Sequence, residues 1–269
     1  MKTLLKEIVK PIYYYIKNKN LREFYKLYDR YGKFGRYVEV KDVKFLSYSF
    51  DVPDVMSFIW QFKEIFVEEI YKFNSDSDSP IIYDCGANIG MSCLYFKKLY
   101  PNSKIKAFEA DPKLVKTLRK NLAKNRILEG IEIIDKAVWI DYNGVEFSVE
   151  GADAGSIYGS RNKIKVASIR LKDFLETEER IDMLKIDIEG AEYEVLKDCK
   201  NSLNKVKNLF VEYHSWNKTD QKLSEILKIF EENGFRYYIE NLTKRKTPFV
   251  NKGELGDMDL QLNIFGIRR

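Results

Sequence analysis

From residue 80 onward, short apolar segments alternate with longer segments whose apolar residues recur at helical spacing. Buried strands separated by helices form a parallel, doubly wound sheet, because each helix returns the chain to the edge where the previous strand began. The predicted strands are residues 81–84, 104–109, 131–138, 183–187, 208–213, 235–240 and 262–267. The predicted helices are residues 91–99, 112–125, 191–199 and 220–233. The alternation therefore predicts an α/β fold.

The pattern becomes less regular in its later part. No clear helix separates residues 235–240 from 262–267, which predicts an antiparallel addition at one edge of the sheet. Two further short strands are expected at residues 145–149 and 163–169, on either side of a glycine-rich loop at 151–160.

The residues before the alternating pattern are predicted to form a mostly helical, turn-rich region. The polar run Asn-Ser-Asp-Ser-Asp-Ser at residues 74–79 separates it from the first predicted strand and favours a loop. We therefore divide the chain into an N-terminal helical cap, residues 1–79, and a main domain, residues 80–269.

The charge of the chain is unevenly distributed. Residues 1–36 contain ten basic and three acidic residues, a net charge of +7, whereas the remaining chain has 36 basic and 38 acidic residues, a net charge of −2. A uniformly basic nucleic-acid binder is excluded as the simple interpretation, because the basic excess lies on one short segment. No apolar run approaches the roughly 18 residues of a membrane span, and charged residues interrupt any N-terminal signal sequence.

Cysteine and histidine are too scarce for several kinds of site. The chain has three cysteines without paired spacing and a single histidine, His214. This composition argues against a structural zinc site and favours a reducing, cytoplasmic compartment. A serine hydrolase is also disfavoured, because no Gly-x-Ser-x-Gly turn is present.

Ligands of open α/β sheets bind at the carboxyl ends of the strands. The first such end reads Asp-Cys-Gly-Ala-Asn-Ile-Gly, with Gly86 and Gly90 four residues apart. These glycines permit a tight turn and the close approach of a ligand. The dinucleotide fingerprint Gly-x-Gly-x-x-Gly is absent here, and Asp84 stands at the start of the loop. A carboxylate in this place repels phosphate and favours a cationic ligand.

The second strand end carries Glu109, nineteen residues after Gly90. An acidic residue at this spacing accepts hydrogen bonds from ribose hydroxyls. A nucleoside with a positive group and without phosphate is S-adenosylmethionine. The alternative is that Glu109 is an ordinary solvated carboxylate at a strand end.

Three runs together resemble the FkbM family of S-adenosylmethionine-dependent methyltransferases. They are the loop at 84–90, Phe-Glu-Ala-Asp-Pro at 108–112 and Leu-Lys-Ile-Asp-Ile-Glu-Gly-Ala-Glu at 184–192. The resemblance covers roughly residues 80–240 and implies a seven-stranded Rossmann-like sheet whose last strand is antiparallel. It also implies O-methylation of hydroxyls of sugars or polyketides. One departure is Lys172, where the family usually has an acid.

The resemblance implies which residues hold the cofactor. The methionine part would lie against the loop after the first strand, the ribose against Glu109 and Ala110, and the adenine near the end of the third strand at residues 136–138, including Ala137. The implied cofactor-binding residues are Asp84, Gly86, Ala87, Asn88, Gly90, Glu109, Ala110, Ala137 and Asp187.

Methyl transfer to a hydroxyl needs a base, because a sugar hydroxyl is not ionised near neutral pH. Asp187 and Glu189 follow the fourth parallel strand, and Glu212 and His214 end the fifth. Our hypothesis is that His214 is the general base and that Asp187 or Glu212 orients it. The alternative for Asp187 and Glu189 is capping of the next helix, and for His214 a packed or surface position. Glu192 and Glu194 are interpreted as solvated helix residues.

Several further assignments stay open at this stage. Asp187, Glu189 and Glu212 offer oxygen ligands for a divalent metal, although nothing in their spacing demands one. Trp216 and Tyr158 are the aromatic residues expected to face the substrate, and the loop 151–160 is either a lid over the acceptor or a surface loop.

The preferred function is an S-adenosylmethionine-dependent O-methyltransferase acting on a sugar hydroxyl in a glycan or glycosylated metabolite. The alternatives are an RNA or other small-molecule methyltransferase, a dinucleotide-dependent oxidoreductase and a non-catalytic nucleoside-binding protein. Residues 1–36 are expected to dock an anionic glycan or lipid carrier, the acidic inner face of a membrane, or a second subunit. The alternative is a basic helix that packs its apolar face on the domain.

Overall fold

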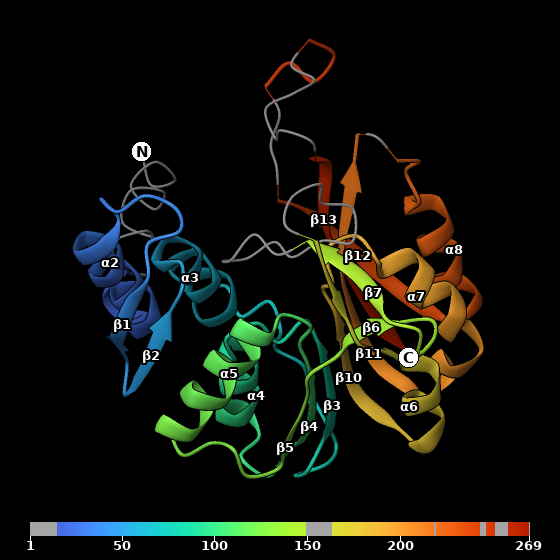
Figure 1. The fold of residues 1–269 in the computed structure, drawn as a ribbon, viewed down its shortest axis with the longest axis horizontal. Helices are drawn as coiled ribbons and strands as arrows, with labels where there is room; N and C mark the ends of the chain where they lie inside the picture. Colours follow the sequence, from blue (N-terminus) through green and yellow to red (C-terminus); the bar gives the residue numbers. More distant parts are fainter. Residues whose placement is uncertain (1–14, 149–162, 218, 243–245, 251–257, 269) are drawn as a thin grey trace, which may run out of the picture.

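The computed structural model describes residues 15–148, 163–217, 219–242, 246–250 and 258–268. Seven strands form one sheet in the order β12-β13-β11-β10-β3-β4-β5 (Figure 1). Their bounds are β3 Ile81–Cys85, β4 Lys104–Phe108, β5 Ile131–Ile134, β10 Ile181–Ile186, β11 Val206–Trp216, β12 Phe235–Asn241 and β13 Met258–Arg268. Only β13 runs against the other strands of this sheet. The predicted α/β fold, a doubly wound and mostly parallel seven-stranded sheet with an antiparallel last strand, is confirmed.

The last two strands form an antiparallel addition at one edge of the sheet, as expected, with β13 inserted between β11 and β12. The structure divides two of the other expected strands. The segment expected as one strand at 131–138 is broken by the exposed Asp135 and Lys136. The segment expected at 163–169 is also divided. The smaller strands are β6 Ala137–Trp139, which pairs with β9 Ser168–Arg170, and β7 Val145–Ser148, which pairs with β8 Lys163–Val166.

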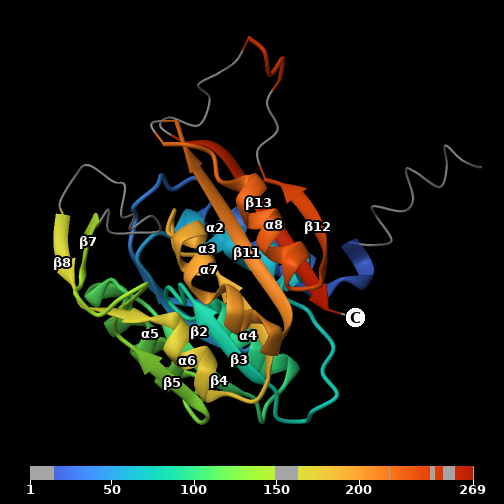
Figure 2. The ribbon, with the colours of Figure 1, turned by 90° about the vertical axis from the view of Figure 1, so that its right-hand side faces the viewer.

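Helices cover both faces of the sheet (Figure 2). The helices α4 (Met91–Leu99) and α5 (Pro112–Lys124) pack on one face. The other face carries α6 Leu171–Thr177, α7 Glu192–Cys199 with the short 3₁₀ helix η2 Lys200–Lys205, and α8 Leu223–Glu232. Each helix follows a strand, so the loops that begin helices gather at the carboxyl ends of the parallel strands.

The N-terminal region contains a β-hairpin that the sequence interpretation missed. Its elements are α2 Lys19–Tyr31, β1 Val40–Phe45, β2 Tyr48–Val52, α3 Val55–Phe62 and the π-helix η1 Lys63–Val67. Alternation of buried and exposed residues is weak in β1, whose burial pattern reads intermediate, exposed, exposed, buried, exposed, buried. The hairpin therefore lacks the strict period of two by which strands are recognised in a sequence.

This region shares a hydrophobic core with the main sheet. The ring centres of Phe66 and Tyr95 lie 5.3 Å apart, and those of Tyr71 and Phe210 lie 4.9 Å apart. Asn121 of α5 donates a hydrogen bond to the Asp51 carbonyl at 3.0 Å. The hydrophobic packing is therefore continuous between residues 15–79 and the main sheet. The predicted domain boundary at residue 79 stays a prediction. Among the described residues, no helix is both long and apolar enough to span a bilayer.

Candidate active site

The loop after β3 passes unusually close to the loop after β10. Gly86 has a φ of +88°, and a Cβ atom at this position would lie 1.8 Å from the carbonyl oxygen of Asp187. Only glycine is compatible with both the positive φ and this contact. The Gly86 and Ala87 amides donate hydrogen bonds to the Phe108 carbonyl at 3.0 and 2.9 Å. The ends of β3, β4 and β10 are thereby fixed around one space.

A pocket opens at these strand ends, and it contains most of the predicted residues. The predicted residues that line it are Gly86, Ala87, Asn88, Glu109, Ala110, Ala137, Asp187, Glu189 and Glu212. Asp84, Gly90 and His214 do not line it. Gly90 instead packs under the helix α5, where a Cβ atom would lie 2.7 Å from Leu118 Cδ1.

Glu109 is a buried and oriented carboxylate, not a solvated one. Its Oε2 accepts a hydrogen bond from the Asn88 amide at 2.8 Å, and its Oε1 accepts one from the Asp111 amide at 2.9 Å. Burial raises the pKa of Glu109 to about 7, although these amide donors oppose the shift. The carboxylate faces the pocket with its remaining lone pairs free to accept hydrogen bonds from a ligand.

Asp84 is not part of the pocket lining, and its expected contact with a ligand stays a prediction. It is fully buried and accepts a hydrogen bond from the Ser92 hydroxyl. Its Oδ1 lies 3.4 Å from Lys185 Nζ. In the structure, the cationic partner of Asp84 is therefore a lysine of the protein itself.

Lys185 is a buried ammonium group that the sequence interpretation missed. Its Nζ lies 3.2 Å from Asp187 Oδ2 and donates a hydrogen bond to the Gly86 carbonyl at 2.9 Å. Burial opposes the charge of Lys185, but Asp187 and the other neighbouring acids raise its pKa above the usual range. A lysine inside an otherwise apolar strand, Met-Leu-Lys-Ile, was the available sequence signal.

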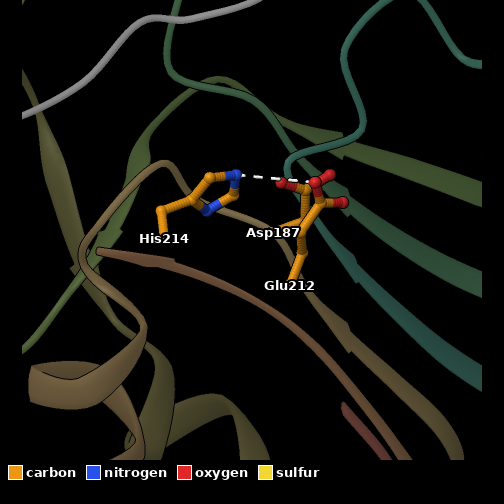
Figure 3. Close-up of side chains that lie close together, drawn as sticks. All are labelled: Asp187, Glu212 and His214. Carbon is orange, nitrogen blue, oxygen red and sulfur yellow. Dashed lines mark ion pairs between the residues drawn. The ribbon is translucent and has the colours of Figure 1, made fainter. Parts of the chain in front are cut away.

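His214 is enclosed by three glutamates (Figure 3 draws it with Asp187 and Glu212). Its Nδ1 lies 3.1 Å from Glu192 Oε1, and its Nε2 lies 3.5 Å from Glu212 Oε1 and 3.6 Å from Glu189 Oε2. Burial opposes protonation, but the negative charges of Glu189 and Glu192 raise the pKa of His214 well above its ordinary value. A protonated imidazole has no lone pair for a substrate proton. The general-base role of His214 stays a prediction, and this geometry favours a positioning role.

Glu192 is buried, which corrects its interpretation as a solvated helix residue. Its Oε1 accepts hydrogen bonds from the Gly190 amide at 2.9 Å and the Ile188 amide at 3.3 Å. Glu192 thus provides the hydrogen-bond acceptor for the amides that precede α7. The N-cap residue of this helix, Ala191, makes no side-chain capping bond. Asp187 pairs with Lys185 and does not cap α7.

The three acids of the pocket lining that come from the ends of β10 and β11 have different proton affinities. Burial and the neighbouring Glu212 raise the pKa of Asp187 to about 6. Burial raises the pKa of Glu189 to about 8, against the opposing charge of His214. The pKa of Glu212 is lowered despite its burial, because His214 and Gln261 both interact with its carboxylate. Asp187 is the acid whose pKa lies closest below neutral pH, where a general base is most effective.

Asp187, Glu212 and His214 are also the candidate metal ligands among the described residues. One ligand atom from each lies within 4.8 Å of the others. Two charged contacts already occupy this cluster, because Lys185 pairs with Asp187 and His214 with Glu212. Glu189, the third oxygen ligand considered from the sequence, lies beside His214. The arrangement fits a network of ion pairs without a metal.

The opposite side of the pocket is built by the N-terminal region, which the sequence interpretation had not connected to the site. Gln61, Glu64, Ile65 and Tyr71 line it. Glu64 belongs to the π-helix η1, a type of helix that is frequent at functional sites. Burial and the charge of Glu212 raise the pKa of Glu64 to about 8. No motif marks these residues, because their role follows from packing.

Of the two predicted substrate-facing aromatic residues, only Trp216 lies in the part of the chain that the structure describes. Trp216 ends β11 and does not line the pocket. Tyr158 and the whole loop 151–160 lie outside the residues that the structure describes.

Comparison with known proteins decides the family. The model of the methyltransferase FkbM domain matches residues 84–237, which include the glycine loop, Glu109 and all four predicted catalytic residues. The chain belongs to the FkbM methyltransferase family. It is therefore a methyltransferase, as its sequence resemblance implied.

The proteins to which this chain is similar include two that are named methyltransferases. Methyltransferase sdnD of Sordaria araneosa is 30% identical over 211 residues, which are 65% of this chain and 80% of that protein. The 2-O-methyltransferase NoeI of Sinorhizobium fredii is 29% identical over 170 residues, 56% of this chain and 68% of that protein. The crystal structure of methyltransferase FkbM from Methylobacillus flagellatus is similar with a TM-score of 0.46 and 18% identity, covering 74% of this chain and 46% of that one.

Proposed function

We propose that this FkbM-family protein transfers a methyl group from S-adenosylmethionine to a hydroxyl of an uncharged, polyhydroxylated acceptor such as a sugar. The observation that carries the proposal is the lining of the single pocket described above. One side of this pocket has Glu109, a carboxylate at the strand end where ribose hydroxyls are expected to bind. The other side has a cluster of acids. The names of the 2-O-methyltransferase NoeI and of 31-O-demethyl-FK506 methyltransferase FkbM support oxygen as the methylated atom.

The residues of the pocket fit S-adenosylmethionine. Glu109 offers a buried carboxylate to ribose hydroxyls. Phe108, Ala110, Ala137 and Val138 provide apolar contact for an adenine ring, and the loop 86–88 borders the same space. The carboxylates of Asp187 and Glu212, which are ionised at neutral pH, create negative potential that favours a cationic sulfonium group. When bound, S-adenosylmethionine supplies an electrophilic methyl group on positively charged sulfur.

Asp187 is proposed as the residue that accepts the proton of the acceptor hydroxyl. It lines the pocket at the end of the central strand β10, next to Gly86. Its pKa of about 6 leaves it ionised at neutral pH and still basic enough to take a proton in the transition state. Lys185 fixes one oxygen of the carboxylate. The His214 imidazolium holds Glu189 and Glu212 beside it and limits their mutual repulsion.

The charge of the pocket selects the acceptor class. The lining contains Glu64, Asp187, Glu189 and Glu212, whereas Lys185 and Lys136 are its lysines. Asp187 and Glu212 are the ionised carboxylates of this group at neutral pH, because the pKa values of Glu64 and Glu189 are raised to about 8. Carboxylates accept hydrogen bonds from hydroxyls and repel phosphates and other carboxylates. A neutral sugar or a related polyol therefore fits better than a phosphorylated acceptor or an RNA backbone. Residues 1–36 remain the proposed acceptor-side or docking segment of the chain.

Calorimetry and a labelled-methyl assay test the proposal. S-adenosylmethionine should bind, and NAD should not. Glu109→Gln should weaken S-adenosylmethionine binding by about 10- to 100-fold, because a charge-assisted hydrogen bond to ribose is lost. Glu132→Gln, an exposed residue of β5, is the matched control. Transfer of labelled methyl to neutral glycans, and not to phosphorylated sugars or RNA, should follow. Binding of NAD in place of S-adenosylmethionine would refute the cofactor assignment.

A further inference from the structure

Four exposed aromatic side chains form one patch on α2, the residues just before it and the end of α3. Tyr15, Tyr25, Tyr28 and Trp60 are 42%, 50%, 45% and 45% exposed. The ring centres of Tyr15 and Tyr25 lie 5.6 Å apart, and those of Tyr28 and Trp60 lie 6.3 Å apart. The buried ring of Phe24 contacts three of them and joins the two pairs. We call these four residues the aromatic patch. Contiguous exposed aromatic surface of this kind marks an interaction site.

Basic side chains surround the aromatic patch. Residues 15–33 contain six basic and two acidic residues. The basic residues classed as exposed in this segment are Lys17, Lys19, Lys26, Arg30 and Lys33. On the side of α3, Lys63 Nζ lies 5.8 Å from the centre of the Trp60 ring. One of the two acids, Glu23, is largely covered, with its side chain 17% exposed. The surface around the patch is therefore positive.

The packing of the inner face of α2 does not explain the exposed tyrosines and lysines on its outer face. Phe24 and Leu27 of this helix are buried in the core that α2 shares with α3. This packing satisfies the apolar side of the helix, as the alternative interpretation of the basic segment expected. The tyrosines of the outer face stay 42–50% exposed, although Tyr25 and Tyr28 touch the core through the ring of Phe24. They require a separate explanation.

We propose that the aromatic patch and its surrounding lysines dock the protein on an anionic lipid surface. Tyrosine and tryptophan are the residues that prefer the headgroup level of a bilayer, because each combines an apolar ring with a polar tip. Lysine and arginine extend their charged ends toward anionic headgroups while their stems cover apolar surface. The excess of exposed basic residues around the patch, Lys17, Lys19, Lys26, Arg30 and Lys33, favours an anionic lipid surface as the occupant, because such a surface carries negative charge over its whole area. The proposal concerns surface binding and is independent of the methyl acceptor.

The patch is connected to the pocket through one helical segment. Trp60 and Lys63 lie on the patch side of α3 and η1, whereas the neighbouring Gln61 and Glu64 line the pocket. Docking through the patch would consequently hold the acceptor side of the pocket near the lipid surface. The helix α8, by comparison, lies at the other end of the molecule (Figure 1).

Vesicle co-sedimentation of the full chain tests the proposal. The probes are vesicles of phosphatidylcholine alone and of phosphatidylcholine mixed equally with phosphatidylglycerol. The protein should bind the anionic vesicles, and high salt should release it. Two double variants remove either component of the surface, Y25S/Y28S and K26E/K33E, and each should weaken binding by about tenfold or more. Tyr238→Ser on β12 and Lys228→Glu on α8, both exposed, are controls that should bind like the original chain.

Thermal unfolding of every variant shows whether a loss of binding reflects a loss of fold. If Y25S/Y28S is destabilised, K26E/K33E still tests the proposal, because exposed lysines rarely contribute to stability. Equal binding to both vesicle types, absence of binding, or unchanged binding of both double variants would overturn it. Retention of a homopolymeric RNA without vesicle binding would assign the surface to nucleic acid instead. A dimer that Y25S/Y28S converts to a monomer, without vesicle binding, would assign it to a second subunit.

Discussion

Glu192 Oε1 lies 3.1 Å from His214 Nδ1, and each of the two side chains is only 1% exposed. The same glutamate oxygen accepts the Ile188 and Gly190 amides, so it ties the loop after β10 to the end of β11. Because His214 does not line the pocket, this pair acts on the site through the position of the neighbouring acids.

We expect Glu192→Gln to lower the free energy of unfolding by about 1–3 kcal/mol, because a buried imidazolium loses its counter-charge while an acceptor for the amides is kept. Urea unfolding measures the change. Glu194→Gln, two residues further along α7 and partly exposed, should have little effect. Equal losses in the two variants would mean that the pair with His214 contributes no specific stability.

Asp187→Asn should lower kcat by about 10²–10⁴-fold, the usual contribution of a general base. The amide keeps the shape of the side chain but cannot accept the proton. Labelled-methyl transfer measures the rate, and calorimetry with S-adenosylhomocysteine should show cofactor-site affinity reduced much less. His214→Asn is the comparison variant and should retain more activity. If His214→Asn abolishes turnover while Asp187→Asn does not, His214 is the base, as first inferred from the sequence.

The sequence was sufficient for the parts of the site that follow from strand order. Glu109 and the glycine loop could be predicted because the carboxyl ends of parallel strands converge, whatever the detailed packing. Lys185 and Glu192 were missed or misjudged because their roles depend on which buried charges meet across elements. Glu64 was missed because it reaches the pocket from a π-helix of the N-terminal region. Residue spacing carries no information on such contacts.

The methylation rate should depend on pH through Asp187. Burial and the charge of Glu212 raise its pKa to about 6, and only its ionised form accepts a proton. The value of kcat/KM should therefore be constant near neutral pH and fall about tenfold per unit as pH decreases below about 6. A pH profile at saturating S-adenosylmethionine measures this. In the residual activity of Asp187→Asn the inflection near pH 6 should be absent, and its persistence would point to another group.

Removal of divalent cations should leave methyl transfer unchanged. Lys185 pairs with Asp187 at 3.2 Å, and His214 lies 3.5 Å from Glu212, so the candidate ligands already have cationic partners. A metal would have to displace these contacts and bind a deprotonated imidazole. The check is activity after dialysis against a chelator, compared with the same sample after magnesium or manganese is restored. Loss of activity that the added metal recovers would contradict the ion-pair interpretation and establish a metal site at Asp187, Glu212 and His214.

Glu64 should make the folded protein less stable as pH rises. Burial and the charge of Glu212 raise its folded-state pKa to about 8, whereas in the unfolded chain it titrates near an ordinary glutamate value of about 4.3. Between these two values the folded state binds more protons, so the stabilising contribution is complete below about pH 4 and is lost as pH approaches 8.

Glu64→Gln should remove this dependence. Near pH 4 the variant and the original chain should be similarly stable, and at pH 8 the variant should be more stable by on the order of 1–2 kcal/mol, a figure reduced because the side chain is half-buried. Urea unfolding at a series of pH values measures the difference, and Glu68→Gln, exposed at the end of the same π-helix, is the control. Parallel stability curves for Glu64→Gln and the original chain would show that the pKa of Glu64 is not raised in the folded protein, which would contradict the effect of burial and of Glu212 on this side chain.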